Sequence, residues 1–297
     1  MSDAPAAGVP RPRWRTYLRL GRVSNLPTIW TNVLAGAALA GAAPRPATAL
    51  LLCLAVSLLY TAGMFLNDAF DREVDARERP ERPIPAGEIT AAEVFLAGFA
   101  MLGGGWLLLA GAARAHGSAA APAVAALLAG AIVVYNLWHK GNPLGPVLMG
   151  LCRALVYAAA ALAVVPGLAA RVVWGAAALL AYVVGLTFAA KQESRGRVRN
   201  LWPLLLIAAP LAYAAVVAQW SATVVVLFAA LTAWIALSVS ALRGPAPDLG
   251  RGVVRLIAGI ALVDALFVAA AGFALLAWVA ALGLPLTLAL QRYVRGT

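Results

Sequence analysis

The stretch from Asn67 to Asp75 gathers the side chains of this chain that could hold a metal ion. Eight of the 12 acidic residues lie at positions 68 to 93, and long apolar runs flank that segment on both sides. On a helix that continues through this stretch, Asn67, Asp71 and Asp75 share one face, because residues four apart lie nearly above one another. Carboxylate oxygens one turn apart, beside an amide oxygen, suit Mg²⁺, whose remaining positions phosphate oxygens commonly fill. The spacing therefore predicts a magnesium site for a phosphate compound.

Basic side chains accompany this acidic segment. Arg72 lies within it, Arg79 and Arg82 follow it, and Lys140 and Lys191 come from later polar loops. Together they could supply the positive charge that a diphosphate requires. The alternative is a loop whose acidic and basic groups balance and simply stay solvated. The regular spacing favours the binding site, as does the position at the mouth of a membrane helix, where charge is costly.

The composition excludes a soluble globular protein. The chain is 63% hydrophobic and 12% charged, with a mean hydropathy of +0.86, and 297 residues cannot form a core large enough to bury so much apolar surface. A membrane-spanning helix needs roughly 20 mainly apolar residues. We therefore expect an all-α, polytopic bundle of nine or ten transmembrane helices. The expected segments are 28 to 43, 47 to 66, 91 to 113, 118 to 138, 146 to 165, 170 to 190, 201 to 218, 221 to 242, 252 to 271 and 273 to 290.

The basic residues predict the orientation of these spans. With ten spans, most of the 23 Lys and Arg residues fall on the side of the N-terminus, and the opposite loops hold only Arg45, Arg114 and Arg171. The positive-inside rule then places the N-terminus and the acidic segment in the cytoplasm, at the cytoplasmic (inner) membrane. We expect residues 1–22 to be a basic cytoplasmic tail and residues 23–297 to be one transmembrane domain. Topology and anionic membrane lipid explain the net charge of +11, so no nucleic acid is expected as a partner.

The residues from Asn67 through Gly87 also resemble a sequence motif of a known protein family. Asn-Asp-x-x-Asp-x-x-x-Asp, followed by Arg-x-x-Arg-Pro-Ile-x-x-Gly, resembles the first aspartate-rich motif of the UbiA superfamily of intramembrane prenyltransferases. Arg22 and Asn25 resemble the polar entry of that family, and positions 135 to 150 resemble its tyrosine-and-lysine loop. The resemblance implies a helical bundle around a central cavity that opens to the cytoplasm. It also implies Mg²⁺, a polyprenyl diphosphate and an aromatic or lipophilic acceptor of the prenyl group.

The resemblance further implies roles for individual residues. Asn67, Asp71 and Asp75 would be magnesium ligands, and Asp68 a weaker candidate ligand or a residue that orients the others; Asp71 and Asp75 would thereby be catalytic. Arg79 and Arg82 would contact the diphosphate or brace the loop. The full set of expected substrate-binding residues is Arg22, Asn25, Arg72, Arg79, Arg82, Lys140, Arg153 and Glu193.

One departure from the family pattern concerns positions 189 to 196. The family carries a second aspartate-rich motif there, whereas this chain has only Glu193 as an acidic residue and Lys191 near the expected metal position. The Lys191 ammonium could replace one cation, which would make it catalytic and leave a one-metal site. Alternatively, diphosphate is bound without efficient ionisation, or prenyl transfer has been lost. The Lys-Gln-Glu-Ser stretch is similar to the EboC-like branch of the superfamily.

Two charged residues fall inside expected spans. Arg153 either faces the cavity and meets phosphate or extends to the lipid headgroups. Asp264 either pairs with an arginine of another helix, contacts the acceptor, or is protonated and structural. His139 is interpreted as a helix-end residue.

The leading hypothesis is a Mg²⁺-dependent prenyltransferase of the cytoplasmic membrane. A non-catalytic carrier of lipid or precursor, with the same fold and first motif, is the main alternative. An unrelated secondary transporter is a third, although such proteins place charges near the bilayer midplane, and here most charges cluster at one surface.

Overall fold

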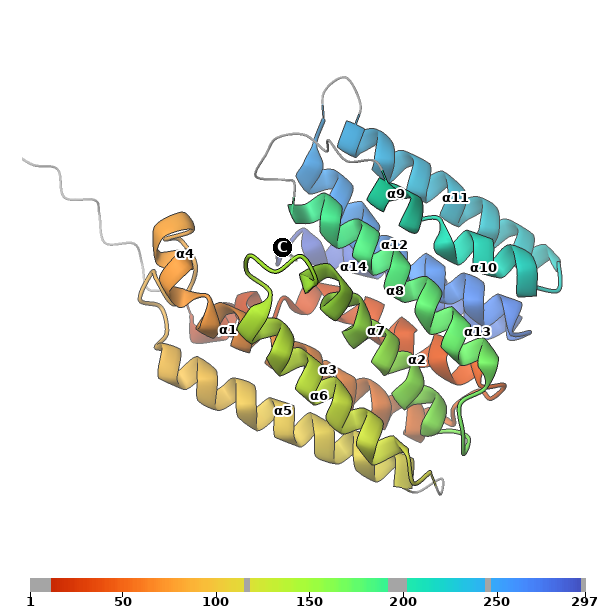
Figure 1. Ribbon diagram of the computed structural model, residues 1–297, viewed down its shortest axis with the longest axis horizontal. Helices are drawn as coiled ribbons and strands as arrows, with labels where there is room; N and C mark the ends of the chain where they lie inside the picture. The colour runs from red at the N-terminus through yellow and green to blue at the C-terminus, as the bar shows by residue number, and fades with distance from the viewer. Residues whose placement is uncertain (1–11, 115–117, 192–201, 244–246, 295–297) are drawn as a thin grey trace, which may run out of the picture.

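A computed structural model of the protein describes residues 12–114, 118–191, 202–243 and 247–294, and all regular structure in these ranges is helical (Figure 1). The elements are α1 (Arg13–Leu20), the short 3-10 helix η1 (Val23–Asn25), α2 (Leu26–Leu39), α3 (Pro46–Phe70), α4 (Arg72–Glu78), α5 (Ala91–Arg114), α6 (Ala121–Trp138), α7 (Gly145–Leu162), α8 (Ala170–Lys191), α9 (Trp202–Leu206), α10 (Ala209–Val217), α11 (Ala222–Arg243), α12 (Leu249–Ala270), α13 (Ala274–Ala281) and α14 (Gly283–Gln291).

The expected all-α membrane bundle is confirmed. Within the described residues, 8 helices are long and apolar enough to cross a membrane, counting Ala274–Gln291 as one, and Leu204–Val217 is a shorter apolar helix. The remaining expected segment, 28 to 43, corresponds to α2, which has 14 residues. The chain is therefore a multi-pass membrane protein. The seventh expected span is divided because Pro210 lies in the first turn of α10, where a residue without an N–H begins a new helix more readily than it continues an old one.

The long helices pack side by side around a central pair, α2 and α7 (Figure 1). One hydrophobic core lies among α2, α3, α5, α6 and α7. The second core joins α2 and α7 to α8 and the helices that follow it. Both halves of the bundle thus share α2 and α7, so the residues on these two helices lie at the centre of the molecule.

Gly36 allows α2 and α7 to approach closely. A Cβ atom at this position would lie 2.5 Å from the carbonyl oxygen of Tyr157 and 2.8 Å from its Cα. Any larger residue would therefore meet backbone rather than a movable side chain. Small residues at helix contacts serve this purpose in membranes.

Part of the expected basic tail is structured. The segment Arg13–Leu20 forms α1, which buries Thr16 and Leu20. Arg19 Nη1 lies 2.8 Å from Glu88 Oε1, and Thr16 donates a hydrogen bond of 2.9 Å to the same carboxylate. Burial of two side chains and these contacts hold α1 against the turn that follows α4, so the segment Arg13–Leu20 of the expected tail is a packed helix.

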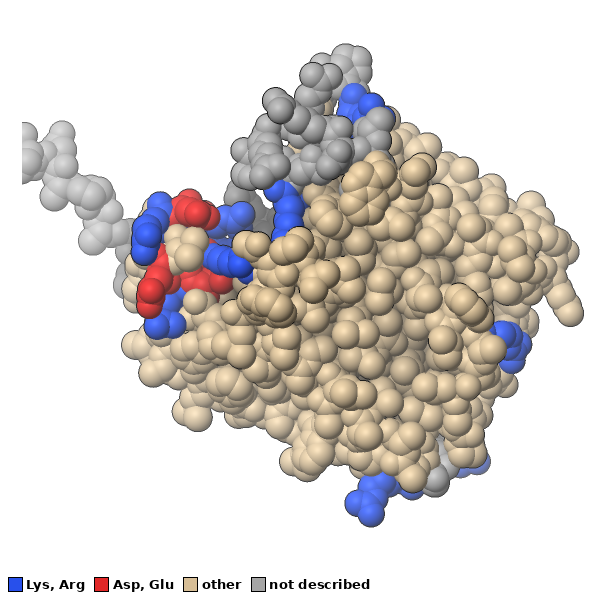
Figure 2. Space-filling model, viewed as in Figure 1, with Lys and Arg blue, Asp and Glu red and all other residues tan. Residues whose placement is uncertain are grey.

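The acidic side chains on the visible face of the molecule gather at the end where α4 lies, as Figure 2 shows. The rest of that face is mainly uncharged, with a few basic residues at its margins. A large uncharged surface of this kind fits a lipid environment.

Candidate active site

The end of α3 and the start of α4 position the acidic segment. α3 ends at Phe70 and α4 starts at Arg72, yet Asp71 between them keeps helical angles (φ −82°, ψ −4°). The N–H of Asp71 donates to Asn67 O at 3.0 Å, and the N–H of Asp75 donates to Asp71 O at 2.9 Å. The helical spacing expected from the sequence therefore continues through the bend.

The side chains of this segment are withdrawn from solvent. Asn67, Asp68, Asp71 and Asp75 are 7%, 6%, 7% and 4% exposed, respectively. Buried carboxylates require partners, since an isolated buried charge is strongly unfavourable. Basic residues from three other parts of the chain supply those partners.

Arg22 and Arg82 contact the same oxygen atom of Asp68. Nη2 of Arg22 and Nη1 of Arg82 each lie 3.1 Å from Asp68 Oδ1. Arg82 also lies 2.7 Å from Asp75 Oδ2, so it joins the end of α3 to α4.

Arg22 has a left-handed backbone (φ 42°), which is an uncommon conformation for a residue with a side chain. Gly87 has φ 72° and allows the tight turn between Arg82 and Glu88.

Asp71 faces the loop after α6. Its Oδ1 lies 3.3 Å from Lys140 Nζ, and its Oδ2 lies 3.4 Å from His139 Nε2. Burial raises the pKa of Asp71, but the hydrogen bonds and positive charge of His139 and Lys140 outweigh that effect and lower it below the usual value. The carboxylate is therefore ionised at neutral pH, as a metal ligand must be.

His139 is a site residue that the sequence interpretation missed. It follows the last residue of α6, as expected for a helix-end residue, but its ring also stacks on Tyr135, with centroids 4.8 Å apart. Its Nδ1 lies 3.1 Å from Tyr135 O. These contacts orient Nε2 toward Asp71. The spacing of four between Tyr135 and His139 is the signal that could have revealed it.

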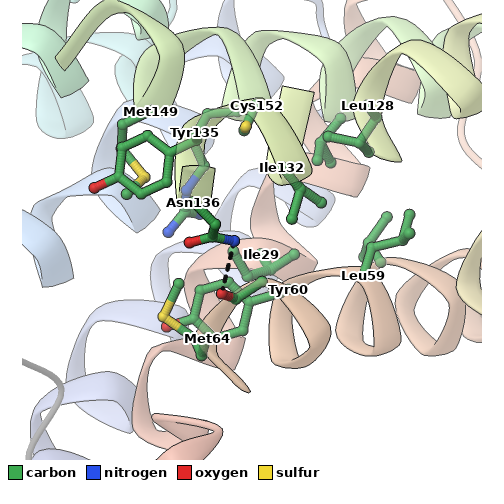
Figure 3. Close-up of a pocket in the computed structure, with 14 residues that line it drawn as sticks. Ile29, Leu59, Tyr60, Met64, Leu128, Ile132, Tyr135, Asn136, Met149 and Cys152 are labelled. Carbon is green, nitrogen blue, oxygen red and sulfur yellow. Dashed lines mark hydrogen bonds between the residues drawn. The ribbon is translucent and has the colours of Figure 1, made fainter. Parts of the chain in front are cut away.

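A pocket lies inside the bundle (Figure 3). It encloses about 590 Å³ of space, its open mouth included, between α2, α3, α6 and α7. The lining residues are Ile29, Val56, Leu59, Tyr60, Gly63, Met64, Leu128, Ile132, Tyr135, Asn136, Met149, Cys152, Arg153 and Val156. Most of them are apolar, as is typical of the lining of small-molecule pockets.

The face of α3 that lines this pocket leads directly to the acidic residues. Val56, Tyr60 and Met64 follow one another at spacings of four, and Asn67 and Asp71 continue the same row. Arg22 Nη1 lies 3.3 Å from Met64 Sδ and Nη2 lies 3.3 Å from Asn67 Oδ1, so this arginine marks the junction. The arrangement suits a ligand with an anionic head and an apolar tail.

Comparison with known sequences identifies the family. The sequence model described as the UbiA prenyltransferase family matches residues 28–251. The chain belongs to this family. The match includes α2 through the start of α12, and therefore the acidic segment, the α6 loop and the whole pocket lining.

Curated relatives match over shorter regions. The digeranylgeranylglyceryl phosphate synthase of Ignicoccus hospitalis is 38% identical over 94 residues, which are 32% of this chain and 30% of that protein. The enzyme of the same name from Methanopyrus kandleri is 33% identical over 132 residues, 44% of this chain and 46% of that protein. The matched regions thus span less than half the length of either relative.

Solved structures of UbiA homologs share the fold. One from Aeropyrum pernix K1 in its apo form has a TM-score of 0.63 and 18% identity, and the match covers 84% of this chain and 97% of that one. One from Archaeoglobus fulgidus bound to GPP and Mg²⁺ has a TM-score of 0.59 and 16% identity, with 87% and 99% covered.

Two candidate residues of this UbiA-family chain, Arg72 and Arg79, form no ion pair with Asp68, Asp71 or Asp75 within the described residues. Arg72 donates to Ala69 O and Glu73 Oε1, both at 3.1 Å, and Arg79 is exposed. Arg72 also lies over the ring of Phe95, 5.9 Å from its centroid. The Arg72 side chain therefore contacts the end of α3, Glu73 of α4 and Phe95 of α5.

Three further candidates lie around the mouth or outside the described residues. Asn25 donates to the Tyr60 hydroxyl at 3.2 Å, which places it beside the pocket. Lys191, at the end of α8, donates to Asn142 O at 3.2 Å, so it contacts the loop that carries Lys140. Glu193 lies outside the described residues.

The donor types at the mouth fit Mg²⁺. Asn67, Asp68, Asp71 and Asp75 all offer oxygen, the ligand that a hard cation prefers. Among the residues described, no group of three or more His, Cys, Asp or Glu side chains is arranged to hold a metal ion. Mg²⁺ in phosphate sites commonly uses only one or two carboxylates, with phosphate and water completing the shell.

Proposed function

We propose that the protein is a Mg²⁺-dependent prenyltransferase that moves an isoprenoid chain from a polyprenyl diphosphate to an aromatic or lipophilic acceptor. The supporting observation is the row on α3 in which an apolar pocket wall leads into buried oxygen ligands. A prenyl diphosphate has the matching shape, because its apolar chain ends in an anionic head. In this proposal the head binds at Asn67, Asp71 and Asp75, and the chain enters the pocket.

The charges at the mouth support a metal requirement. Arg22, Arg82 and Lys140 face Asp68, Asp71 and Asp75, so three permanent cations meet three carboxylates. Their charges balance before any ligand arrives. A diphosphate with two or three negative charges therefore needs further positive charge in this low-dielectric site. Mg²⁺, when bound, supplies that charge and polarises the oxygen that leaves.

The reaction breaks one bond and forms another. The bond between the allylic carbon and the diphosphate oxygen breaks, and its electron pair stays with diphosphate. The acceptor forms the new bond to that carbon and releases a proton. Arg22, Arg82 and Lys140 would hold the departing oxygens through charge-assisted hydrogen bonds. The apolar pocket would keep water from the reactive carbon.

The location is also part of the proposal. The positive-inside distribution of basic residues supports a cytoplasmic membrane in which α1, α4 and the loop after α6 face the cytoplasm. Arg22 follows α1, Arg82 lies in the turn after α4, and Lys140 lies in the loop after α6, so the diphosphate would enter from the cytoplasmic side.

Release of inorganic diphosphate tests the proposal. The purified protein would be incubated with geranyl, farnesyl or geranylgeranyl diphosphate, with Mg²⁺ or with EDTA, and with aromatic or lipid acceptors. Asp71→Asn and Asp75→Asn should each lose about 100-fold or more of the rate, the usual effect of removing a group that stabilises transition-state charge. Glu73→Gln is the matched control, since the Glu73 side chain is 74% exposed and pairs with Arg72. Equal rates in all four proteins would refute the proposed site.

A non-catalytic carrier is the second candidate, because the end of α8 carries Lys191 where the resemblance calls for an acidic ligand. A carrier should bind the diphosphates with dependence on Asp71 and Asp75. It should release no diphosphate with any acceptor. Binding and turnover measured on the same preparation therefore separate the two functions.

A further inference from the structure

The arginines of this chain differ in whether they can reach lipid headgroups. Arg153 of α7 donates to Thr28 O at 3.0 Å and to Asn32 Oδ1 at 2.8 Å. These contacts hold its guanidinium against α2 inside the bundle, so Arg153 does not extend to the headgroups, which was one of the two interpretations of the sequence. The arginines of α1, by contrast, lie on the outside of the molecule.

α1 has one packed face and one exposed face. Its sequence contains three arginines and no acidic residue. Thr16 and Leu20, which are four residues apart, are buried, whereas Trp14 is 58% exposed and Arg15 is exposed as well. An amphipathic helix rich in arginine, with tryptophan among its exposed residues, is typical of helices at a membrane surface.

The protein neutralises only part of the positive charge of α1. Arg13 Nη2 lies 3.0 Å from Glu93 Oε2, yet the Arg13 side chain is 75% exposed. Arg15 forms no ion pair within the described residues, and its guanidinium lies over the ring of Trp14, 5.2 Å from the centroid. This distance allows a cation–π contact. Arg13, Trp14 and Arg15 therefore form one exposed surface that is both cationic and aromatic.

α1 lies beside the ends of two membrane-spanning helices. The ring of Tyr17 is 5.9 Å from the ring of Phe65, near the end of α3, and the Tyr17 hydroxyl donates to Glu93 in the first turn of α5. A spanning helix ends where hydrocarbon gives way to lipid headgroups. The contacts of Tyr17 therefore place α1 at the level of the headgroups.

Exposed tryptophans mark the same level elsewhere on the molecule. Trp138 is the last residue of α6 and Trp202 the first of α9, and both are exposed. Trp202 lies against Phe188 near the end of α8, with ring centroids 5.5 Å apart. At the opposite end, Trp174 and Trp220 are exposed near the starts of α8 and α11. Because tryptophan gathers at both membrane–water interfaces, these residues delimit the bilayer, and Trp14 lies at the first of the two boundaries.

We infer that the exposed face of α1, formed by Arg13, Trp14 and Arg15, docks on the surface of an anionic bilayer. The two guanidinium groups contact lipid phosphates, and the indole lies among the headgroups. Anionic lipid is the partner that the charge fits, because α1 combines a net positive charge with a position at the headgroup level. The inference goes beyond the proposed function and does not depend on it.

Hydrogen exchange of α1, followed by mass spectrometry, tests the docking. The full chain would be placed in lipid nanodiscs of phosphatidylcholine alone, and in nanodiscs of equal parts phosphatidylcholine and phosphatidylglycerol. The amides of α1 should exchange about fivefold more slowly or better in the anionic discs, the effect expected of one arginine near an anionic surface. Equal exchange of α1 in the two kinds of disc would overturn the inference and favour an acidic protein as the partner of this face.

α4 provides an internal control in the same samples. It lies at the same end of the molecule as α1, but its exposed Arg77 stands between the exposed acids Glu73 and Glu78. Since α4 carries no net positive charge, its exchange should be the same in both discs. A slowing of α4 equal to that of α1 would show a general effect of the lipid and would overturn the inference.

Variants then locate the effect. Arg15→Gln should reduce the ratio of the exchange rates of α1 in the two discs several-fold, whereas Arg77→Gln, the matched control, should leave the ratio unchanged. Trp14→Ala should speed exchange in both discs and keep the ratio, because the contribution of the indole does not depend on lipid charge. About 1 M NaCl, which shortens the screening length to about 3 Å, should remove the ratio. A ratio that is unchanged in Arg15→Gln would overturn the inference.

Discussion

Substitution of Gly36 by alanine tests the packing at the centre of the bundle. The new Cβ would lie 2.5 Å from Tyr157 O and 2.8 Å from Tyr157 Cα, about 1 Å closer than ordinary contact between such atoms. The clash is with backbone, so α2 and α7 must separate. Overpacking of this kind costs about 1–3 kcal/mol. Gly103→Ala is the matched control, because the same change in α5 meets nothing within 4 Å and carries the same change in helix propensity.

Unfolding by SDS in mixed micelles, followed by circular dichroism, measures the difference. Gly36→Ala should be about 1–3 kcal/mol less stable than Gly103→Ala. Equal stability of the two glycine variants would refute the close approach of α2 and α7.

Three other substitutions test different parts of the molecule. Glu88→Gln should loosen the turn that carries Arg82, because the Glu88 carboxylate lies 2.8 Å from the Arg19 guanidinium. In kinetics of diphosphate release, KM should rise several-fold while kcat stays nearly unchanged. Asp264→Asn changes the buried carboxylate that accepts hydrogen bonds from Thr31, Asn32 and Tyr157, and micelle unfolding should show a loss of about 1–3 kcal/mol. An unchanged unfolding curve would contradict the importance of these contacts. Leu128→Trp fills part of the apolar pocket, so competition between geranyl and geranylgeranyl diphosphates should shift toward the shorter one.

Local features of this protein could be predicted from its sequence. The apolar runs predicted the membrane-spanning helices, because the bilayer requires about 20 apolar residues per span. The spacing of Asn67, Asp71 and Asp75 predicted a shared face, because all three depend on one stretch of helix. The bend at Asp71 did not alter that result, since the backbone hydrogen bonds continue through it.

Contacts between distant segments could not be predicted in the same way. Asp264 and Thr31 are 233 positions apart, and nothing in the spacing of either segment indicates that they meet. Arg72 and Arg82 have equal chemistry, yet Gly87 and the contact of Glu88 with α1 turn only Arg82 toward Asp68. The direction of an arginine depends on the chain around it, so the position of both residues beside the acidic segment predicted the same role for each.

The loop after α6 contacts both the acidic segment and the end of α8. These contacts bear on the number of metal ions. Lys140 of this loop pairs with Asp71, and Asn142 O of the same loop accepts from Lys191 at the end of α8. The end of α8 therefore presents an ammonium group rather than an oxygen ligand to the α6 loop. An ammonium can hold phosphate oxygens but cannot bind a second cation. We therefore expect one Mg²⁺, held by the α3–α4 acids, with Lys191 supplying positive charge on the opposite side of the diphosphate.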